Sequence, residues 1–267
     1  MQNNDLLARW RRNERTLGTW LSMANTHSAE SLANTGYDWL CCDLQHGLLD
    51  YTDLRTMLPA MTGRGVTTLV RVPWNEPYEI MKVLDLGAAG VIVPLVNSAE
   101  EAQRAVWACR YPPQGGRSFG PVRAALIGGR GYAVAANEQV ACIAMIETQQ
   151  GLDNLDAIAA TPGLDGIYIG PADLALALGL PAQGDTDEPV HGAAVARILE
   201  VCKRQGIAAG IHTSSVRFAK RYYDMGFNFI NVGSDVGFMM RAAVEDLRQV
   251  KADSITGESA AREPTGY

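Results

Sequence analysis

Short apolar segments rich in strand-forming residues alternate with longer segments of helical periodicity, and this alternation restricts the fold more than any other feature. The segments predicted as strands are 17–23, 39–43, 67–72, 90–94, 140–147, 166–170, 207–212 and 229–233. Predicted helices between them include 29–35, 78–86, 99–109, 153–160, 190–205, 215–225 and 236–250. Such alternation predicts a parallel sheet. Eight strands favour a single α/β domain of the (β/α)8 TIM barrel type, because a doubly wound sheet usually has fewer strands and a glycine-rich phosphate turn.

Composition supports one domain and excludes several classes of function. We expect the barrel to occupy residues 1–250 and residues 251–267 to form a flexible C-terminal tail, because the tail is rich in small and polar residues without apolar periodicity. A net charge of -6 argues against nucleic-acid binding. The polar N-terminus and the absence of a long apolar stretch predict a cytoplasmic protein without membrane contact. The five scattered cysteines are expected to be reduced thiols.

In a barrel of this type the side chains at the carboxyl ends of the strands converge on one open face, which is where catalysis takes place. Candidate residues at these ends are Asp43, Gln45, His46, Arg71, Glu147, Asp173 and His212. No lysine lies at a strand end, so a Schiff-base mechanism is disfavoured. The glycine-rich segment 110–139 is read as a long loop after the fourth strand and is expected to form a wall or lid of the active site.

Two carboxylates follow neighbouring predicted strands. Glu147 comes directly after an apolar run, where an unpaired charge would be costly, and Asp173 follows about one strand–helix unit later. Two carboxylates with open positions suit a hard divalent ion such as Mg²⁺ or Mn²⁺. The alternative is an ion pair between Glu147 and an arginine, with Asp173 capping the next helix. The helix opened by Gly170 and Pro171 could also receive an anionic group of a substrate.

A histidine and an arginine complete the candidate chemistry. Asp43 precedes His46 by three residues, a spacing that would let the carboxylate orient the imidazole of a general base, although a structural role for the histidine is equally compatible with this pattern. Arg71 could stabilise a developing oxyanion or simply neutralise Glu147 or Asp43. His212 could line the pocket and affect its shape or specificity.

Several separate motifs occur in an order that resembles one enzyme family. They are Tyr37-Asp38-Trp39 with Asp43-Leu44-Gln45-His46, Val70-Arg71-Val72-Pro73-Trp74-Asn75, Arg110-Tyr111-Pro112-Pro113 with Gly116-Arg117, Ile146-Glu147-Thr148, and Gly170-Pro171-Ala172-Asp173-Leu174. Together they resemble the HpcH/HpaI family of metal-dependent (class II) pyruvate aldolases. The resemblance covers roughly residues 16–250.

The resemblance implies a reversible aldolase that cleaves a 4-hydroxy-2-oxo acid into pyruvate, or hydroxypyruvate, and an aldehyde. It implies a divalent ion (Mg²⁺, Mn²⁺ or Co²⁺) held by Glu147 and Asp173, a base at His46 held by Asp43, and stabilisation of the enolate by Arg71. It further implies that the Ala172 backbone contacts the substrate carboxylate. Gly170 and Pro171, which open the same helix, would also bind substrate.

Two further implications concern assembly and specificity. Asp85 matches an acidic residue of the family that acts on the histidine, and by the predicted strand order it would have to reach the site of a neighbouring subunit in a hexamer with exchanged C-terminal helices. The alternative is that Asp85 is an ordinary carboxylate at the end of a helix. Gln45 and Met145 stand where heptanedioate-type relatives have Glu and a substrate-binding Gln. The reaction is therefore expected to be retained and the substrate to differ. A lyase acting on acyl-CoA thioesters and an inactive keto-acid-binding barrel remain the alternatives.

Overall fold

The computed structural model describes residues 4–254 and contains a closed barrel of parallel strands in the order β1 to β8. The strands are β1 (Thr16–Leu21), β2 (Trp39–Asp43), β3 (Thr67–Arg71), β4 (Gly90–Val93), β5 (Ala141–Ile146), β6 (Gly166–Ile169), β7 (Ala208–Ile211) and β8 (Phe229–Ser234). Every strand begins and ends within two residues of the boundaries predicted for it. The predicted (β/α)8 barrel is confirmed.

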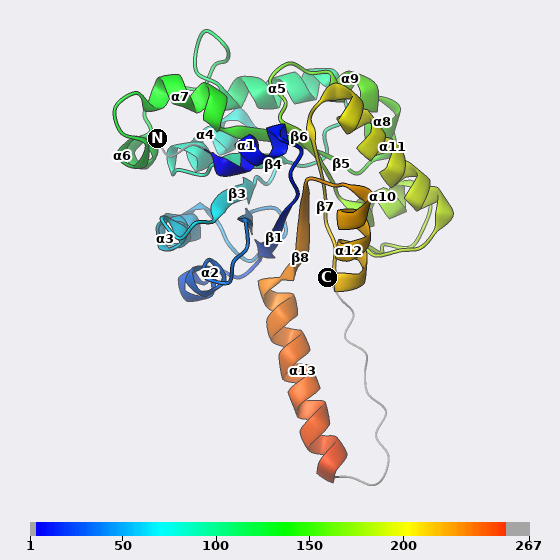
Figure 1. Cartoon of the computed structure of the whole chain (residues 1–267). Helices are drawn as coiled ribbons and strands as arrows, with labels where there is room; N and C mark the ends of the chain where they lie inside the picture. Colours follow the sequence, from blue (N-terminus) through cyan, green and yellow to red (C-terminus); the bar gives the residue numbers. More distant parts are fainter. Residues whose placement is uncertain (1–3, 255–267) are drawn as a thin grey trace.

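Helices surround the barrel (Figure 1). They are α1 (Asp5–Arg11), α2 (Thr26–Leu32), α3 (Tyr51–Met61), α4 (Pro77–Asp85), α5 (Ala99–Cys109), α6 (Val122–Gly128), α7 (Tyr132–Gln139), α8 (Gln149–Asp153), α9 (Leu155–Ala159), α10 (Pro171–Ala177), α11 (Pro189–Gln205), α12 (Val216–Met225) and α13 (Asp235–Ser254). None of the helices in the described residues is both long and apolar enough to cross a membrane.

The apolar residues form two cores because alternate side chains of each strand point to opposite sides of the sheet. The outer core lies between the strands and the helices and includes Leu40, Val70 and Val91. The inner core fills the barrel and includes Trp39, Tyr168 and Phe229. Helix α1 closes the amino-terminal end of the barrel, since its buried residues join the inner core and Trp10 packs on Phe229 with ring centroids 4.3 Å apart. The opposite end remains for the active site.

The segment 110–139 does not form the predicted active-site wall. Helix α5 separates it from β4, so the chain has already returned to the amino-terminal end of the barrel when this segment begins. It contains α6 and α7, and the Asn4 side chain beside α1 donates hydrogen bonds to Gln139 O (2.8 Å) and Ala89 O (3.0 Å). Figure 1 accordingly shows α6 and α7 near α1, at the end opposite α13.

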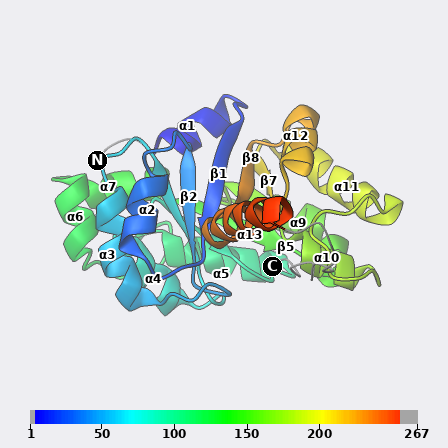
Figure 2. The ribbon, with the colours of Figure 1, turned by 90° about the horizontal axis from the view of Figure 1, so that it is seen from below.

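Helix α13 leaves the barrel at the carboxyl end of β8 and projects away from it (Figure 1). Figure 2 looks onto the molecule from this end, with α13 seen nearly along its axis. The helix continues to Ser254, beyond the predicted domain boundary at residue 250. The rest of the predicted tail, residues 255–267, lies outside the described residues.

Candidate active site

A buried ion pair joins the ends of β2 and β3. Asp43 and Arg71 are partners in the parallel register of the two strands, and the two residues are 4% and 8% exposed. Arg71 Nε donates to Asp43 Oδ1 (2.8 Å) and Nη2 donates to Oδ2 (2.7 Å). Burial alone would raise the pKa of Asp43, but the hydrogen bonds and charge of Arg71 outweigh this effect and lower it. Arg71 therefore neutralises Asp43, which is one of the two roles considered for it above.

The Asp43 carboxylate does not orient the His46 imidazole as expected. Its Oδ1 accepts the backbone N–H groups of Gln45 (3.0 Å) and His46 (3.3 Å), and both carboxylate oxygens are bound by Arg71. The reason is local, because an aspartate that precedes a tight turn readily binds the amides two and three residues later. Asp43 thus holds the turn that carries His46. The imidazole itself is exposed and has no hydrogen-bond or ion-pair partner within residues 4–254.

Arg71 keeps one nitrogen free of carboxylates. Nη1 lies 3.8 Å from Met145 Sδ, a weak acceptor, and the guanidinium stacks over Trp20 at 4.5 Å. His212 packs edge-on against the same indole at 5.3 Å. Burial, and then the charge of Arg71, lower the pKa of His212 to about 4. The histidine is therefore neutral at pH 7 and lines the site beside the arginine.

Glu147 is a buried carboxylate without a cationic partner. Its side chain follows β5 directly and is 2% exposed. Oε1 accepts the backbone N–H of Leu95 (2.8 Å), and no ion pair to Glu147 exists in the described part of the chain. Burial raises the pKa of Glu147 to about 7, with the charge of Asp173 adding to the effect and the Leu95 hydrogen bond and the charge of Arg71 opposing it. Leu95 has a left-handed φ of 53°, which costs a leucine about 1–3 kcal/mol.

The second oxygen of Glu147 explains the glycine that directly follows the next strand, β6. A Cβ added to Gly170 would lie 2.1 Å from Glu147 Oε2 and 2.6 Å from Met145 Cε. A larger residue would displace the carboxylate from its present position. Gly170 also begins α10, whose first turn contains Ala172 and Asp173. Asp173 is not the N-cap, is exposed, and makes no hydrogen bond or ion pair among the described residues.

The donor set fits a divalent cation. A deeply buried carboxylate raised to a pKa of about 7 and a second carboxylate from the adjacent strand's end form a site where positive charge would be stabilising. No group of three or more His, Cys, Asp or Glu side chains that could hold a metal occurs in residues 4–254. Glu147 and Asp173 are the two residues that could hold such an ion, with substrate and water completing the shell.

Asp85 lies elsewhere. It is the last residue of α4, at the amino-terminal end of the barrel, as the predicted strand order required. Its Oδ1 accepts a hydrogen bond from Arg117 Nη2 (2.7 Å), whose guanidinium stacks over Tyr111 at 4.6 Å. Within one chain Asp85 cannot reach His46.

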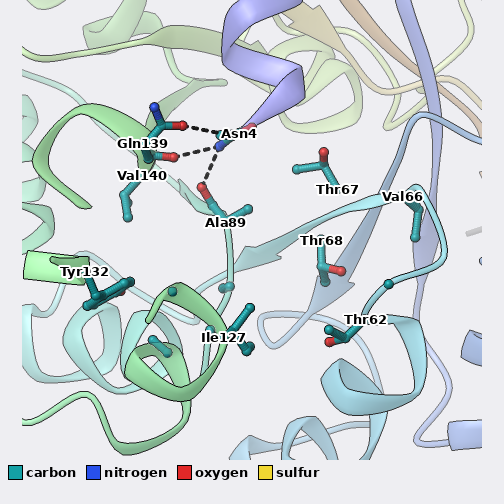
Figure 3. A pocket seen from close by; sticks show the side chains of 15 residues that line it. Asn4, Thr62, Val66, Thr67, Thr68, Ala89, Ile127, Tyr132, Gln139 and Val140 are labelled. Carbon is teal, nitrogen blue, oxygen red and sulfur yellow. Dashed lines mark hydrogen bonds between the residues drawn. The ribbon is translucent and has the colours of Figure 1, made fainter. Parts of the chain in front are cut away.

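The amino-terminal end also contains a cavity, shown in Figure 3. It measures about 150 Å³ and is lined by the first residues of β3, by the residues just before β4 and β5, and by residues including Asn4, Ile127 and Tyr132. None of its lining residues is acidic, basic or a histidine. It therefore lacks the groups that acid–base or metal chemistry needs, and the candidate active site is the one at the carboxyl ends of the strands.

Sequence reasoning missed three residues beside this site. Trp20 lies under Arg71, Leu95 binds Glu147 through its amide, and His191 contacts the first turn of α10. Trp20 and Leu95 carry no titratable group, and His191 lies in a helix rather than at a strand end. No pattern of spacing distinguishes such residues before the chain is folded.

Comparison with known proteins agrees with this geometry. The family model described as HpcH/HpaI aldolase/citrate lyase matches residues 16–242. A hydroxypyruvate/pyruvate aldolase of Paraburkholderia phytofirmans is 40% identical over 257 residues, covering 93% of this chain and 98% of that protein. A 5-keto-4-deoxy-D-glucarate aldolase of Klebsiella pneumoniae is 38% identical over 239 residues, covering 86% and 90%. The crystal structure of an HpcH/HpaI aldolase/citrate lyase family protein from Burkholderia cenocepacia gives a TM-score of 0.87 at 38% identity, covering 93% and 99%.

The barrel is closed and parallel, with polar residues at the carboxyl ends of its strands. Together with these relatives, it defines a carbon–carbon lyase, an enzyme that acts on carbon–carbon bonds. The chain belongs to the HpcH/HpaI aldolase/citrate lyase family.

Proposed function

We propose that the protein is a metal-dependent class II aldolase that reversibly cleaves a 4-hydroxy-2-oxo acid into pyruvate, or hydroxypyruvate, and an aldehyde. The observation that carries this proposal is the buried Glu147 carboxylate, which forms no ion pair within residues 4–254 and lies beside Asp173 on the active-site face. The relatives named above are aldolases of hydroxypyruvate, pyruvate and a keto-deoxy sugar acid. They favour this reaction over that of a lyase acting on acyl-CoA thioesters.

Glu147 and Asp173 would hold a divalent ion such as Mg²⁺, Mn²⁺ or Co²⁺, which supplies a Lewis acid for the carbonyl of the keto acid. Arg71 would place a fixed positive charge beside the same oxygen, through the Nη1 that Asp43 leaves free. Because Asp43 binds the other two guanidinium nitrogens, the charge is held in place before substrate arrives. The Ala172 backbone N–H would bind the substrate carboxylate, with Gly170 and Pro171 lining this part of the site.

His46 would act as the base in cleavage. It removes the proton of the 4-hydroxyl, the bond between C3 and C4 breaks, and the electron pair passes into the enolate of the keto acid. Protonation at C3 then releases pyruvate. The exposed imidazole, held by the Asp43 turn, is free to perform this transfer. Its loss is expected to reduce the rate by about 10² or more.

Gln45, Met145 and His212 would set substrate preference. Met145 offers Arg71 only a weak thioether acceptor, and His212 beside it is a neutral imidazole. Apart from Arg71, this part of the pocket would therefore bind a keto acid through uncharged groups. Both pyruvate and hydroxypyruvate should therefore be tested as the keto acid.

Proton exchange on pyruvate tests the reaction directly. The methyl signal of pyruvate in D₂O is followed by NMR with metal-stripped protein, with Mg²⁺ added back, and with the Glu147→Gln and His46→Ala variants. Exchange that requires Mg²⁺ and is lost in Glu147→Gln supports the proposal. Glu200→Gln, an exposed change on α11, is the matched control. Absence of exchange with pyruvate and hydroxypyruvate under any metal would refute the aldolase.

We further propose that the enzyme is a homo-oligomer, a hexamer as its resemblance implies, in which α13 of one copy packs on another. Exposed apolar side chains of Met239, Met240, Val244 and Leu247 share one face of α13. Because α13 projects from the barrel, an apolar cavity of about 230 Å³ lies open beside β8 and α12, lined by residues including Val216 and Tyr223. A second copy's α13 would cover both surfaces.

Assembly would also bring Asp85 to the active site of a neighbouring copy, which is the only way it could act on His46. Leu247→Glu should shift the protein to smaller species in size-exclusion chromatography with light scattering. Gln249→Lys, on the polar side of the same helix beside Glu245, should leave the assembly intact. An unchanged mass for Leu247→Glu would refute this role of α13.

A further inference from the structure

His191 is a buried histidine that lies outside the proposed chemistry and contacts the turn that carries a proposed metal ligand. It occupies the first turn of α11 and is 0% exposed. Its Nε2 lies 3.0 Å from the carbonyl oxygen of Pro171, the first residue of α10. The contact therefore joins two helices that are separated in sequence by a loop and that both face the active-site end.

The hydrogen bond fixes the form of the imidazole. A carbonyl only accepts, so Nε2 must carry the proton, and Nδ1 is then a buried lone pair. Nδ1 has no hydrogen-bond partner within residues 4–254. Burial lowers the pKa of His191, so the ring is neutral at pH 7. An apolar side chain would avoid the cost of about 1–3 kcal/mol for the unsatisfied nitrogen, which indicates that the histidine is there for the bond it makes to Pro171.

The first turn of α10 is packed through its buried apolar residues but has few polar side-chain contacts among the described residues. The helix has seven residues, and its N-cap Gly170 provides no side-chain hydrogen bond. Pro171 and Leu174 are buried, but Asp173 is exposed and without a partner among the described residues. The direction of the Asp173 carboxylate and of the Ala172 amide therefore depends on the orientation of the turn, and the His191 bond is the polar side-chain contact that restrains it.

We propose that His191 is a positioning residue which, through the Pro171 carbonyl, holds the first turn of α10 so that Asp173 meets Glu147 at the metal site. This inference rests on the proposed function. It assigns His191 no contact with substrate or metal. Its effect is on the distance between the Glu147 carboxylate, which follows β5, and the Asp173 carboxylate in the first turn of α10. Loss of the bond should weaken cation binding more than it weakens the fold.

The test compares two substitutions of nearly equal size. Glutamine can donate a hydrogen bond from its own Nε2, whereas leucine cannot, so His191→Gln should preserve the contact and His191→Leu should remove it. Binding of Mn²⁺ to metal-stripped protein is measured from the electron paramagnetic resonance signal of the free ion. We expect His191→Leu to bind Mn²⁺ about 10-fold or more weakly, as loss of an outer contact of a metal site usually does, and His191→Gln to remain within about threefold of the wild type.

Two results would overturn the inference. One is wild-type Mn²⁺ affinity in His191→Leu, and the other is an equal loss in both variants. A ¹⁵N NMR spectrum of the wild-type protein gives independent evidence, since it should show a neutral histidine protonated at Nε2, and protonation at Nδ1 would contradict the bond. If the wild-type protein itself fails to bind Mn²⁺, the metal site is wrong and this inference falls with it, a result distinct from normal binding in every variant.

Discussion

Glu147 should make the stability of the metal-free protein fall as the pH rises. Its pKa in the folded protein is about 7, compared with 4.5 for an ordinary glutamate, chiefly because the side chain is buried. Between these two values the unfolded chain loses the proton while the folded protein keeps it, so unfolding becomes easier with each unit of pH. Above pH 7 both states are ionised and the loss is complete.

The size of the effect follows from the shift. At about 1.4 kcal/mol for each pKa unit, a rise from 4.5 to about 7 corresponds to a loss of about 3 kcal/mol in the free energy of unfolding. The substitution Glu147→Gln removes the charge and preserves the shape, and the amide oxygen can still accept the Leu95 N–H. In the absence of metal the variant should therefore be more stable than the wild type by about 3 kcal/mol at pH 8. At pH 5 the difference should be less than about 1 kcal/mol.

Urea unfolding in EDTA at pH 5 and pH 8 measures the free energy of unfolding of both proteins. In thermal unfolding at pH 8, the melting temperatures of the two proteins should differ by roughly 6–12 °C for a domain of this size. Glu200→Gln, an exposed change, should have no comparable effect. Added Mg²⁺ should stabilise the wild type and not Glu147→Gln. The reasoning fails if Glu147→Gln is less stable than the wild type at pH 8 without metal, or if the difference is the same at both pH values.

Three further predictions concern the same site. Gly170→Ala would place a Cβ 2.1 Å from Glu147 Oε2, so the affinity for Mn²⁺, measured by electron paramagnetic resonance, should fall at least about 10-fold. An unchanged affinity would contradict the proposed position of the carboxylate. Arg71→Lys cannot bind Asp43 through two nitrogens and should slow pyruvate deuteration about 10², a rate near that of the wild type being the contrary result. Mn²⁺ affinity should rise about 10-fold per pH unit below pH 7 and level off above it, because the ion competes with the proton on Glu147; calorimetry that shows no such slope would exclude Glu147 as a ligand.

The barrel could be predicted from local patterns because each unit of it has a local cause. Each buried parallel strand needs a short apolar segment, and each connection to the next parallel strand needs a helix. Gly206 and Gly226 end α11 and α12 in the left-handed conformation, which glycine adopts at little cost. The predicted strand boundaries agreed well with the structure for this reason.

The segment 110–139 shows where local patterns were insufficient. Its glycines and prolines predicted a loop, but whether a loop lies on the active-site face depends on the direction in which the chain enters it. The helix 99–109 was itself predicted, and counting it would have placed the segment at the amino-terminal end. The loss of this expected wall leaves the active site bounded by the shorter segments that follow the strands.

The sequence alone determined which residue types stand at the carboxyl ends of the strands, since strand length and order bring Asp43, Arg71, Glu147 and the turn before Asp173 to one face. Only the tertiary structure decided what each side chain contacts. Asp43 binds Arg71 and two backbone amides rather than the His46 imidazole, because side chains from separate segments compete for the same carboxylate oxygens. The burial that raises the pKa of Glu147, and the contact of His191 with Pro171, likewise come from residues distant in sequence, whose packing no local pattern specifies.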